Sequence, residues 1–133
     1  MSLHSALAYH GMIPEFVPVT TSVTSGRPEE IETPCGRFQF RHVSTRLLFG
    51  FSEVEIAPGQ RALLASAQKA LVDLLYLTPH SDQEAYLREL RVEPAEWFDR
   101  ETLRETVQRA GSRKVERAVR LLLERWDDEE AEA

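Results

Sequence analysis

The period of the hydrophobic pattern changes near Ser66, and this change constrains the fold more than any other feature of the sequence. From about residue 17 up to Ser66, apolar residues alternate with polar ones, which is typical of strands with one buried face. After Ser66, apolar residues recur every three or four positions, as they do in amphipathic helices. Strands followed by helices in one short chain predict an α+β fold.

The predicted elements begin with a short helix that starts at Ser2 and ends at Gly11. An antiparallel sheet of four or five short strands follows, with strands at residues 17–23, 37–42, 51–56 and 61–65 and a loop at 24–30. About four helices then pack on one face of this sheet. Their expected N-terminal ends lie at Ser66, near Ser81 or Asp82, at Asp99 and at Ser112, and Gly111 ends the third.

The periodicity also assigns side chains to the core. Alternation at 37–42 predicts that Phe38, Phe40 and His42 face the core while Arg37, Gln39 and Arg41 face solvent. Residues 61–65 read as a short buried strand. The expected helical core positions are Leu71, Leu74, Leu75, Val115, Val119, Leu122 and Trp126.

Length and charge limit the kinds of protein that this chain can be. The 133 residues suit one domain over residues 1–126, followed by an acidic tail at 127–133 that is expected to be disordered. The tail holds five of the 22 acids, so the rest of the chain carries 16 basic residues against 17 acids, which is not the balance of a general nucleic-acid binder. No apolar run has the length of a membrane span and no signal peptide is present, so a cytoplasmic protein is expected.

Catalytic and metal-binding patterns are not found in the sequence. Cys35, the single cysteine, reads as an ordinary turn residue, and no phosphate-binding glycine loop or His/Cys metal motif occurs. Lys69 and Asp73, four residues apart on a helix, are expected to form a surface ion pair. The prediction is therefore a protein that is not an enzyme and that has no cofactor and no metal site.

A basic ridge on the last predicted helix is the candidate contact surface. It consists of Arg113, Lys114, Arg117 and Arg120. Because these arginines recur at i, i+4 and i+7, they share one helix face, and their guanidinium groups suit phosphates or an acidic partner. The structural alternative is a solvated face on which Glu116 and Glu124 pair with Arg120.

Five blocks of sequence carry a resemblance to a known family. They lie at residues 2–15, 19–24, 36–42, 59–65 and 65–77, where the last reads ASAQKALVDLLYL. In this order and spacing, over residues 2–125, the chain resembles the AbiEi-family antitoxin domain of type IV abortive-infection toxin–antitoxin systems. The family's Pro-Glu before Lys69 is replaced here by Ala67-Gln68. The family usually carries an N-terminal winged helix-turn-helix, and this sequence starts at or just after that junction, so we expect either the C-terminal domain of a longer protein or a compact form with the antitoxin half alone.

The resemblance implies an antitoxin that counteracts a nucleotidyltransferase toxin of the AbiEii type, without requiring a stable complex with it. It also implies a contribution to transcriptional autoregulation, with the basic ridge as the candidate contact to DNA, RNA or an acidic partner. Two other classes stay open. One is a small metal-dependent nuclease that uses Glu53, Glu55 and Lys69, and the other is a dimerisation or interaction module that forms a homo-oligomer.

Overall fold

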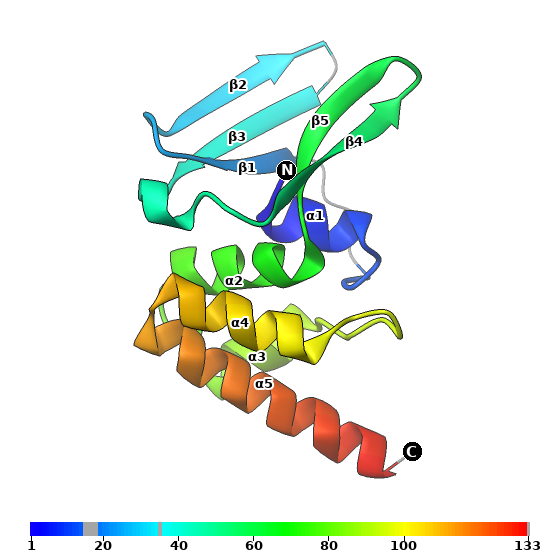
Figure 1. Cartoon of the computed structure of the whole chain (residues 1–133), viewed down its shortest axis with the longest axis vertical. Coiled ribbons are helices and arrows are strands. Elements are labelled where there is room, and N and C mark those ends of the chain that lie inside the picture. Colours follow the sequence, from blue (N-terminus) through cyan, green and yellow to red (C-terminus); the bar gives the residue numbers. More distant parts are fainter. Residues whose placement is uncertain (15–18, 35, 133) are drawn as a thin grey trace.

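The computed structural model describes residues 1–14, 19–34 and 36–132, without the side chains of residues 56, 57, 60 and 61. Within these ranges the chain forms an N-terminal helix, five short strands in two sheets, and four further helices (Figure 1). The α+β fold predicted from the sequence is confirmed. Val17 and Cys35, expected in a strand and in a turn, lie outside the described residues.

The elements follow one another in the predicted order, with the strands before the last four helices. The N-terminal part holds α1 (Leu3–Tyr9), β1 (Val19–Thr24), β2 (Glu29–Thr33) and β3 (Gly36–His42), then a 3-10 turn (Thr45–Leu47), β4 (Phe51–Ala57) and β5 (Gln60–Ala65). The C-terminal part holds α2 (Ala67–Leu77), α3 (Glu84–Leu90), α4 (Arg100–Ala110) and α5 (Arg113–Glu132).

The strands do not form the single antiparallel sheet that the sequence predicts. One sheet has the order β1-β3-β2, with β1 parallel and β2 antiparallel to β3, and β4 and β5 form a separate antiparallel hairpin. The sheet is mixed because β3 pairs antiparallel with β2 on one edge and parallel with β1 on the other.

Strand β2 falls partly within the stretch expected to be a loop. Its sequence is EEIET, and its first four residues are exposed, so no alternation of buried and exposed side chains marks it. It occupies an edge of the sheet and is held by its pairing with β3. Backbone hydrogen bonds therefore define this strand, rather than burial.

The face of β3 that turns toward the helices is the opposite of the predicted one. Phe38 and Phe40 are only half-buried and do not pack against the core, and His42 is exposed, with Nδ1 2.9 Å from the carbonyl of Gly26. In contrast, Arg41 reaches α2 and donates a hydrogen bond to the carbonyl of Leu77 at 3.4 Å. The reason is the register in which β1 pairs with β3.

In that register, Thr21 of β1 lies beside Gln39 and Val23 lies beside Arg41. Thr21 is buried and Val23 packs against the core, so this is the face that turns inward. In β1, Val23 supplies the apolar contact with the core. Residues paired across two strands point to the same face of the sheet, so the β3 residues beside Thr21 and Val23, which are Gln39 and Arg41, also face inward.

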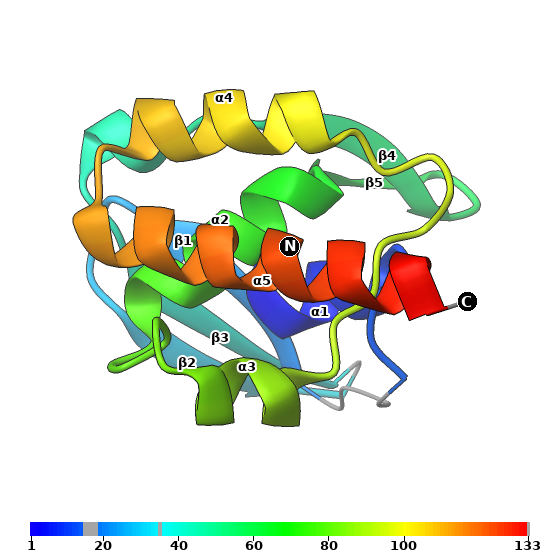
Figure 2. The same ribbon diagram turned by 90° about the horizontal axis from the view of Figure 1, so that it is seen from below.

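Helix α2 is the centre of the molecule. Every residue from Ala67 to Leu75 is buried, because α1, β5, α4 and α5 surround the helix (Figures 1 and 2). All seven helical core positions expected from the sequence are buried. Three predicted helix ends hold as well: Ser66 Oγ accepts from Lys69 N–H at 3.1 Å, Asp99 caps α4, and Gly111 ends α4 in the left-handed conformation. Helix α3 begins at Glu84, after the start predicted near Ser81 or Asp82.

Residues 127–132 lie in the acidic segment that was expected to be disordered, and here they form the last turns of α5, which continues through Glu132. Asp127 and Glu130 both pair with Arg100 of α4, and Glu129 lies 3.5 Å from Arg125 within α5. The two pairs with Arg100 hold the acidic turns of α5 against α4. Among the described helices, none has the length and apolar character needed to cross a membrane.

Candidate functional site

Two of the four cations of the basic ridge, Lys114 and Arg117, bind other residues of the fold, and the other two, Arg113 and Arg120, are exposed. Lys114 donates from Nζ to the carbonyls of Tyr76 and Thr78, each at 2.9 Å, at the C-terminal end of α2. This places a positive charge at the negative end of the helix dipole. Arg117 is held by Asp82, with a guanidinium nitrogen 2.8 Å from Oδ2, and this partner holds the pKa of the Asp82 carboxyl below its usual value.

Arg113 and Arg120 are exposed, and within the described part of the chain neither forms an ion pair. The expected pairing of Arg120 with Glu116 or Glu124 is therefore not found among these residues. Arg120 instead lines a shallow groove of about 460 Å³ between α4 and α5, together with Arg104, Glu116, Glu124 and Asp127. Because this groove carries charges of both signs, it does not form a purely basic surface.

Lys69 and Asp73 form a buried ion pair, so the surface pair expected from their spacing is wrong. The exposed fractions of the two residues are 0% and 1%. Lys69 Nζ donates to Asp73 Oδ1, and Ser2 Oγ donates to Asp73 Oδ2 at 2.6 Å. The ammonium group also lies 4.9 Å from the ring centroid of Phe49 and 5.3 Å from that of Phe51.

Burial acts on the two pKa values in opposite directions. Loss of water lowers the pKa of Lys69 and raises the pKa of Asp73, because both charged forms lose their hydration. The mutual attraction of the two charges opposes both shifts. Arg109 adds to the lowering of the Lys69 pKa, whereas the amino group of Met1 and the hydrogen bond from Ser2 favour the Asp73 carboxylate.

The three residues named for a metal-dependent nuclease, Glu53, Glu55 and Lys69, differ in their exposure. Both glutamates are exposed on β4, and Glu55 accepts a hydrogen bond from the backbone N–H of Gly59 at 3.0 Å. Lys69 is enclosed and bound to Asp73. Within the described residues, no group of three or more His, Cys, Asp or Glu residues is placed to hold a metal ion.

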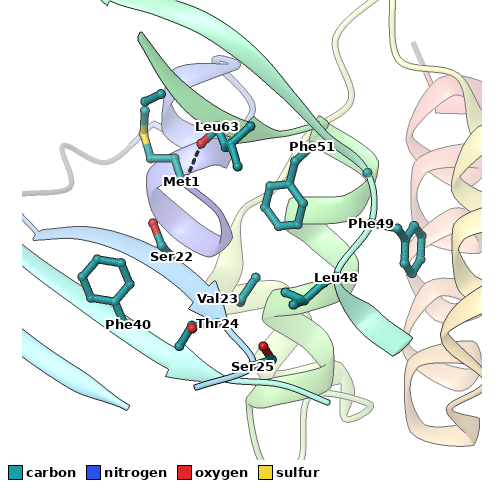
Figure 3. Close-up of a pocket in the computed structure, with 12 residues that line it drawn as sticks. Met1, Ser22, Val23, Thr24, Ser25, Phe40, Leu48, Phe49, Phe51 and Leu63 are labelled. Carbon is teal, nitrogen blue, oxygen red and sulfur yellow. Dashed lines mark hydrogen bonds between the residues drawn. The ribbon is translucent and has the colours of Figure 1, made fainter. Parts of the chain in front are cut away.

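An open groove between the two sheets is the feature that sequence reasoning missed. It has a volume of about 700 Å³ (Figure 3). One wall comes from β1 and β3, with Ser22, Thr24 and Phe40, and the other from the segment before β4, from β4 and from β5, with Leu48, Phe51 and Leu63. The prediction of a buried strand at 61–65 is wrong for Leu63, which is 61% exposed, although Leu64 and Ala65 are buried.

Comparison with known protein families, with curated proteins and with solved structures finds no match to this chain. The fold and the site define an α+β protein with a buried lysine–aspartate pair at its centre and an open, largely apolar groove between its sheets.

Proposed function

We propose that this chain is the antitoxin of a type IV toxin–antitoxin system of the AbiEi type. In this proposal it acts in the cytoplasm against a nucleotidyltransferase toxin of the AbiEii type, needs no stable complex with that toxin, and contributes to regulation of the shared operon. It has no catalytic role. The proposal rests on the sequence resemblance and on where the resembling blocks lie in the fold.

The observation that carries the proposal is the convergence of three of these blocks around α2. Ser2, in the first block, donates its hydroxyl hydrogen to Asp73, in the last block, at 2.6 Å. His10, also in the first block, has Nε2 2.9 Å from the carbonyl of Ala65, where the fourth block ends. If the chain shares the family's fold, residues that match the family pattern should contact one another in the core. These contacts therefore support a resemblance that extends to the fold.

The proposed contact surface is the exposed part of the basic ridge. Arg113 and Arg120 are the members whose guanidinium groups are available to a nucleic acid or an acidic partner, since Lys114 and Arg117 are bound within the fold. A charge reversal at Arg113 and Arg120 removes the attraction without breaking a described ion pair.

The test is a growth assay in which this chain is co-expressed with the nucleotidyltransferase encoded beside its gene. Restored growth with the wild-type chain is expected. Growth that stays arrested while the antitoxin is folded and abundant would contradict the proposal.

The contact surface is tested in the same assay with Arg113→Glu/Arg120→Glu, for which we expect weaker rescue. The matched control is Arg27→Glu/Arg88→Glu, which reverses two exposed arginines on other elements and should keep full rescue. Equal rescue by both double variants would exclude the ridge as the contact surface. Binding of the operon's promoter DNA, measured by gel shift with the same variants, tests the regulatory part.

A further inference from the structure

We propose that an exposed aromatic surface, formed by Tyr9, His10 and Trp97, binds an arginine-rich segment of a partner polypeptide. We call this surface the aromatic patch. The inference goes beyond the antitoxin proposal and does not depend on it, because the patch includes no residue of the basic ridge.

Three aromatic rings from two distant segments form the patch. Tyr9 is the last residue of α1, His10 follows it, and Trp97 lies in the loop between α3 and α4 (Figure 1). The ring centroid of His10 lies 5.6 Å from that of Tyr9 and 5.7 Å from that of Trp97. Tyr9 and Trp97 are 53% and 56% exposed. Single exposed apolar residues are common on proteins, but these two exposed rings both contact His10 and form one surface.

The fold holds these rings in place. His10 Nε2 lies 2.9 Å from the carbonyl oxygen of the last residue of β5, which fixes the imidazole ring. Trp97 is the third residue of a turn that is closed by a hydrogen bond of 2.9 Å from the N–H of Phe98 to the carbonyl of Ala95. The Trp97 ring contacts that of Phe98, which packs edge-to-face against buried Trp126. Rings that are fixed before a partner arrives lose little conformational entropy on binding.

The loop that carries Trp97 is acidic. Residues 92–99 read VEPAEWFD and contain three acids and no basic residue. Asp99 caps α4, whereas Glu93 and Glu96 are exposed and, among the described residues, form no ion pair. Arg100, the first basic residue after the loop, is itself bound to two acids of α5. A partner that covers the aromatic patch therefore meets uncompensated negative charge beside it.

Aromatic rings next to free carboxylates favour a guanidinium group as the ligand. A cation over the face of an indole or phenol ring is attracted by the ring's electron density, and the planar group of arginine also stacks on the ring. The fold contains this contact already, since the guanidinium of Arg109 lies 3.9 Å from the ring centroid of Phe49. Tryptophan, tyrosine and arginine are also the residues that contribute most to binding at protein interfaces.

The same charges argue against two other ligands. Glu93 and Glu96 attract a guanidinium group but repel the phosphates of a nucleic acid. A neutral sugar would gain from stacking on Tyr9 and Trp97 but nothing from the two carboxylates. An arginine-rich polypeptide is the ligand that uses both the rings and the acids.

The experiment is an NMR titration of the full chain with a synthetic peptide. The chain has two tryptophans, so its spectrum contains two indole N–H signals. Trp97 reports on the patch, and Trp126, whose indole N–H donates to the carbonyl of Val92, reports on the core. The probe is Gly-Arg-Gly-Arg-Gly-Arg-Gly with blocked ends. In an extended chain its arginines lie about 7 Å apart, so that one can stack on a ring while the next reaches a carboxylate. We expect the Trp97 signal to shift and to saturate with a Kd on the order of 1 mM or lower, while the Trp126 signal keeps its position.

Two controls test the contribution of the rings and of the cation. A peptide with citrulline in place of arginine keeps the shape of the side chain without its charge, and we expect it to bind roughly tenfold more weakly. Tyr9→Ala should weaken binding of the arginine peptide about two- to fivefold. The matched variant Ile31→Ala, at an exposed apolar residue on β2, should leave the affinity unchanged.

A pair of double variants tests the contribution of the acids. Glu93→Gln/Glu96→Gln should weaken binding about two- to tenfold, because each exposed charge contributes a modest attraction. Glu29→Gln/Glu32→Gln makes the same change in net charge at exposed positions on β2, and it should keep the affinity within about twofold.

Four results would overturn the proposal. The first is a Trp97 signal that does not shift saturably with the arginine peptide. The second is equal affinity for the citrulline peptide, which would remove the role of the cation. The third is equal weakening by the two double variants, which would assign binding to the overall negative charge of the chain. The fourth is tighter binding of a glucose oligosaccharide or of single-stranded DNA at Trp97, which would assign the patch to a different class of ligand.

Discussion

Separating the two charges of the Lys69–Asp73 pair should destabilise the protein far more than removing both. In Lys69→Met the carboxyl of Asp73 stays buried without its cation, and in Asp73→Asn the ammonium of Lys69 stays buried without its anion. The double variant Lys69→Met/Asp73→Asn leaves no buried charge. It also keeps an acceptor for the hydroxyl of Ser2, which donates to Asp73 Oδ2 at 2.6 Å.

The magnitude follows from the complete burial of both side chains, at 0% and 1% exposure. Leaving one uncompensated buried charge costs about 3–5 kcal/mol, whereas replacing a buried pair by neutral groups of similar volume is often close to neutral. We expect each single variant to lose that amount and the double variant to lie within about 1 kcal/mol of wild type. The resulting coupling energy is about 5 kcal/mol or more in magnitude.

The two single variants should also differ in the sign of their pH dependence. In Lys69→Met, the pKa of Asp73 is raised by burial with no cation to oppose it. The folded state then binds this proton more tightly than the unfolded chain. Stability is therefore lost as the pH rises through the folded pKa, and acid restores it. In Asp73→Asn, the lowered pKa of Lys69 has the opposite effect, so stability is lost as the pH falls through that pKa and alkaline pH restores it.

The assay is urea unfolding of the four proteins at several pH values, followed by circular dichroism. Glu129→Gln is the control, since Arg125–Glu129 is also an i,i+4 pair but lies at the surface at 3.5 Å, and its loss should cost less than about 1 kcal/mol. The reasoning is refuted if the single and double variants lose equal stability, or if both single variants have the pH profile of wild type.

Three further predictions concern local contacts. Gly50→Ala should destabilise the fold by more than Gly59→Ala. Both glycines have positive φ, which costs an alanine about 1–2 kcal/mol, but only at Gly50 would the new methyl group lie 2.9 Å from side-chain atoms of buried Lys69. Equal losses of stability in urea unfolding would contradict this prediction. Lys114→Met should lower the free energy of unfolding by about 1.5–3 kcal/mol, because two carbonyls at the end of α2 lose a charged hydrogen-bond donor. A similar loss in Arg113→Met, at an exposed arginine, would argue against this role of Lys114. Truncation after Trp126 should lower the free energy of unfolding by only about 1 kcal/mol, since the ion pairs that it removes are exposed. A truncated chain that does not fold would contradict this prediction.

The helices were predicted well because their signals are local. Ser66, Asp99 and Gly111 act on backbone groups within a few residues of themselves, so their roles can be read without knowing the rest of the fold. The same holds for the apolar stripe of α5, which includes Val115 and Trp126, since helical spacing alone places these residues on one face.

The sheet was predicted less well because alternation identifies two faces but not which one meets the helices. Phe38 and Phe40 suggested the inner face, yet Thr21 and Val23 of the neighbouring strand decide the orientation through the register. Pairing partners are distant in the sequence, so the parallel pairing of β1 and β3 leaves no local trace.

The sequence alone determined the α+β class, the order of the elements, the ends of most helices and the core of α2, because each depends on periodicity or on capping by near neighbours. Tertiary structure alone decided that the polar residues Lys69 and Asp73 of α2 are buried. An i,i+4 lysine–aspartate pair has the same spacing at a surface and in a core, and here Phe49, Phe51 and Ser2, from two other segments, enclose it. The helical state of the acidic C-terminal segment and the groove beside β5 depend in the same way on residues brought together by folding, such as Arg100 and Met1.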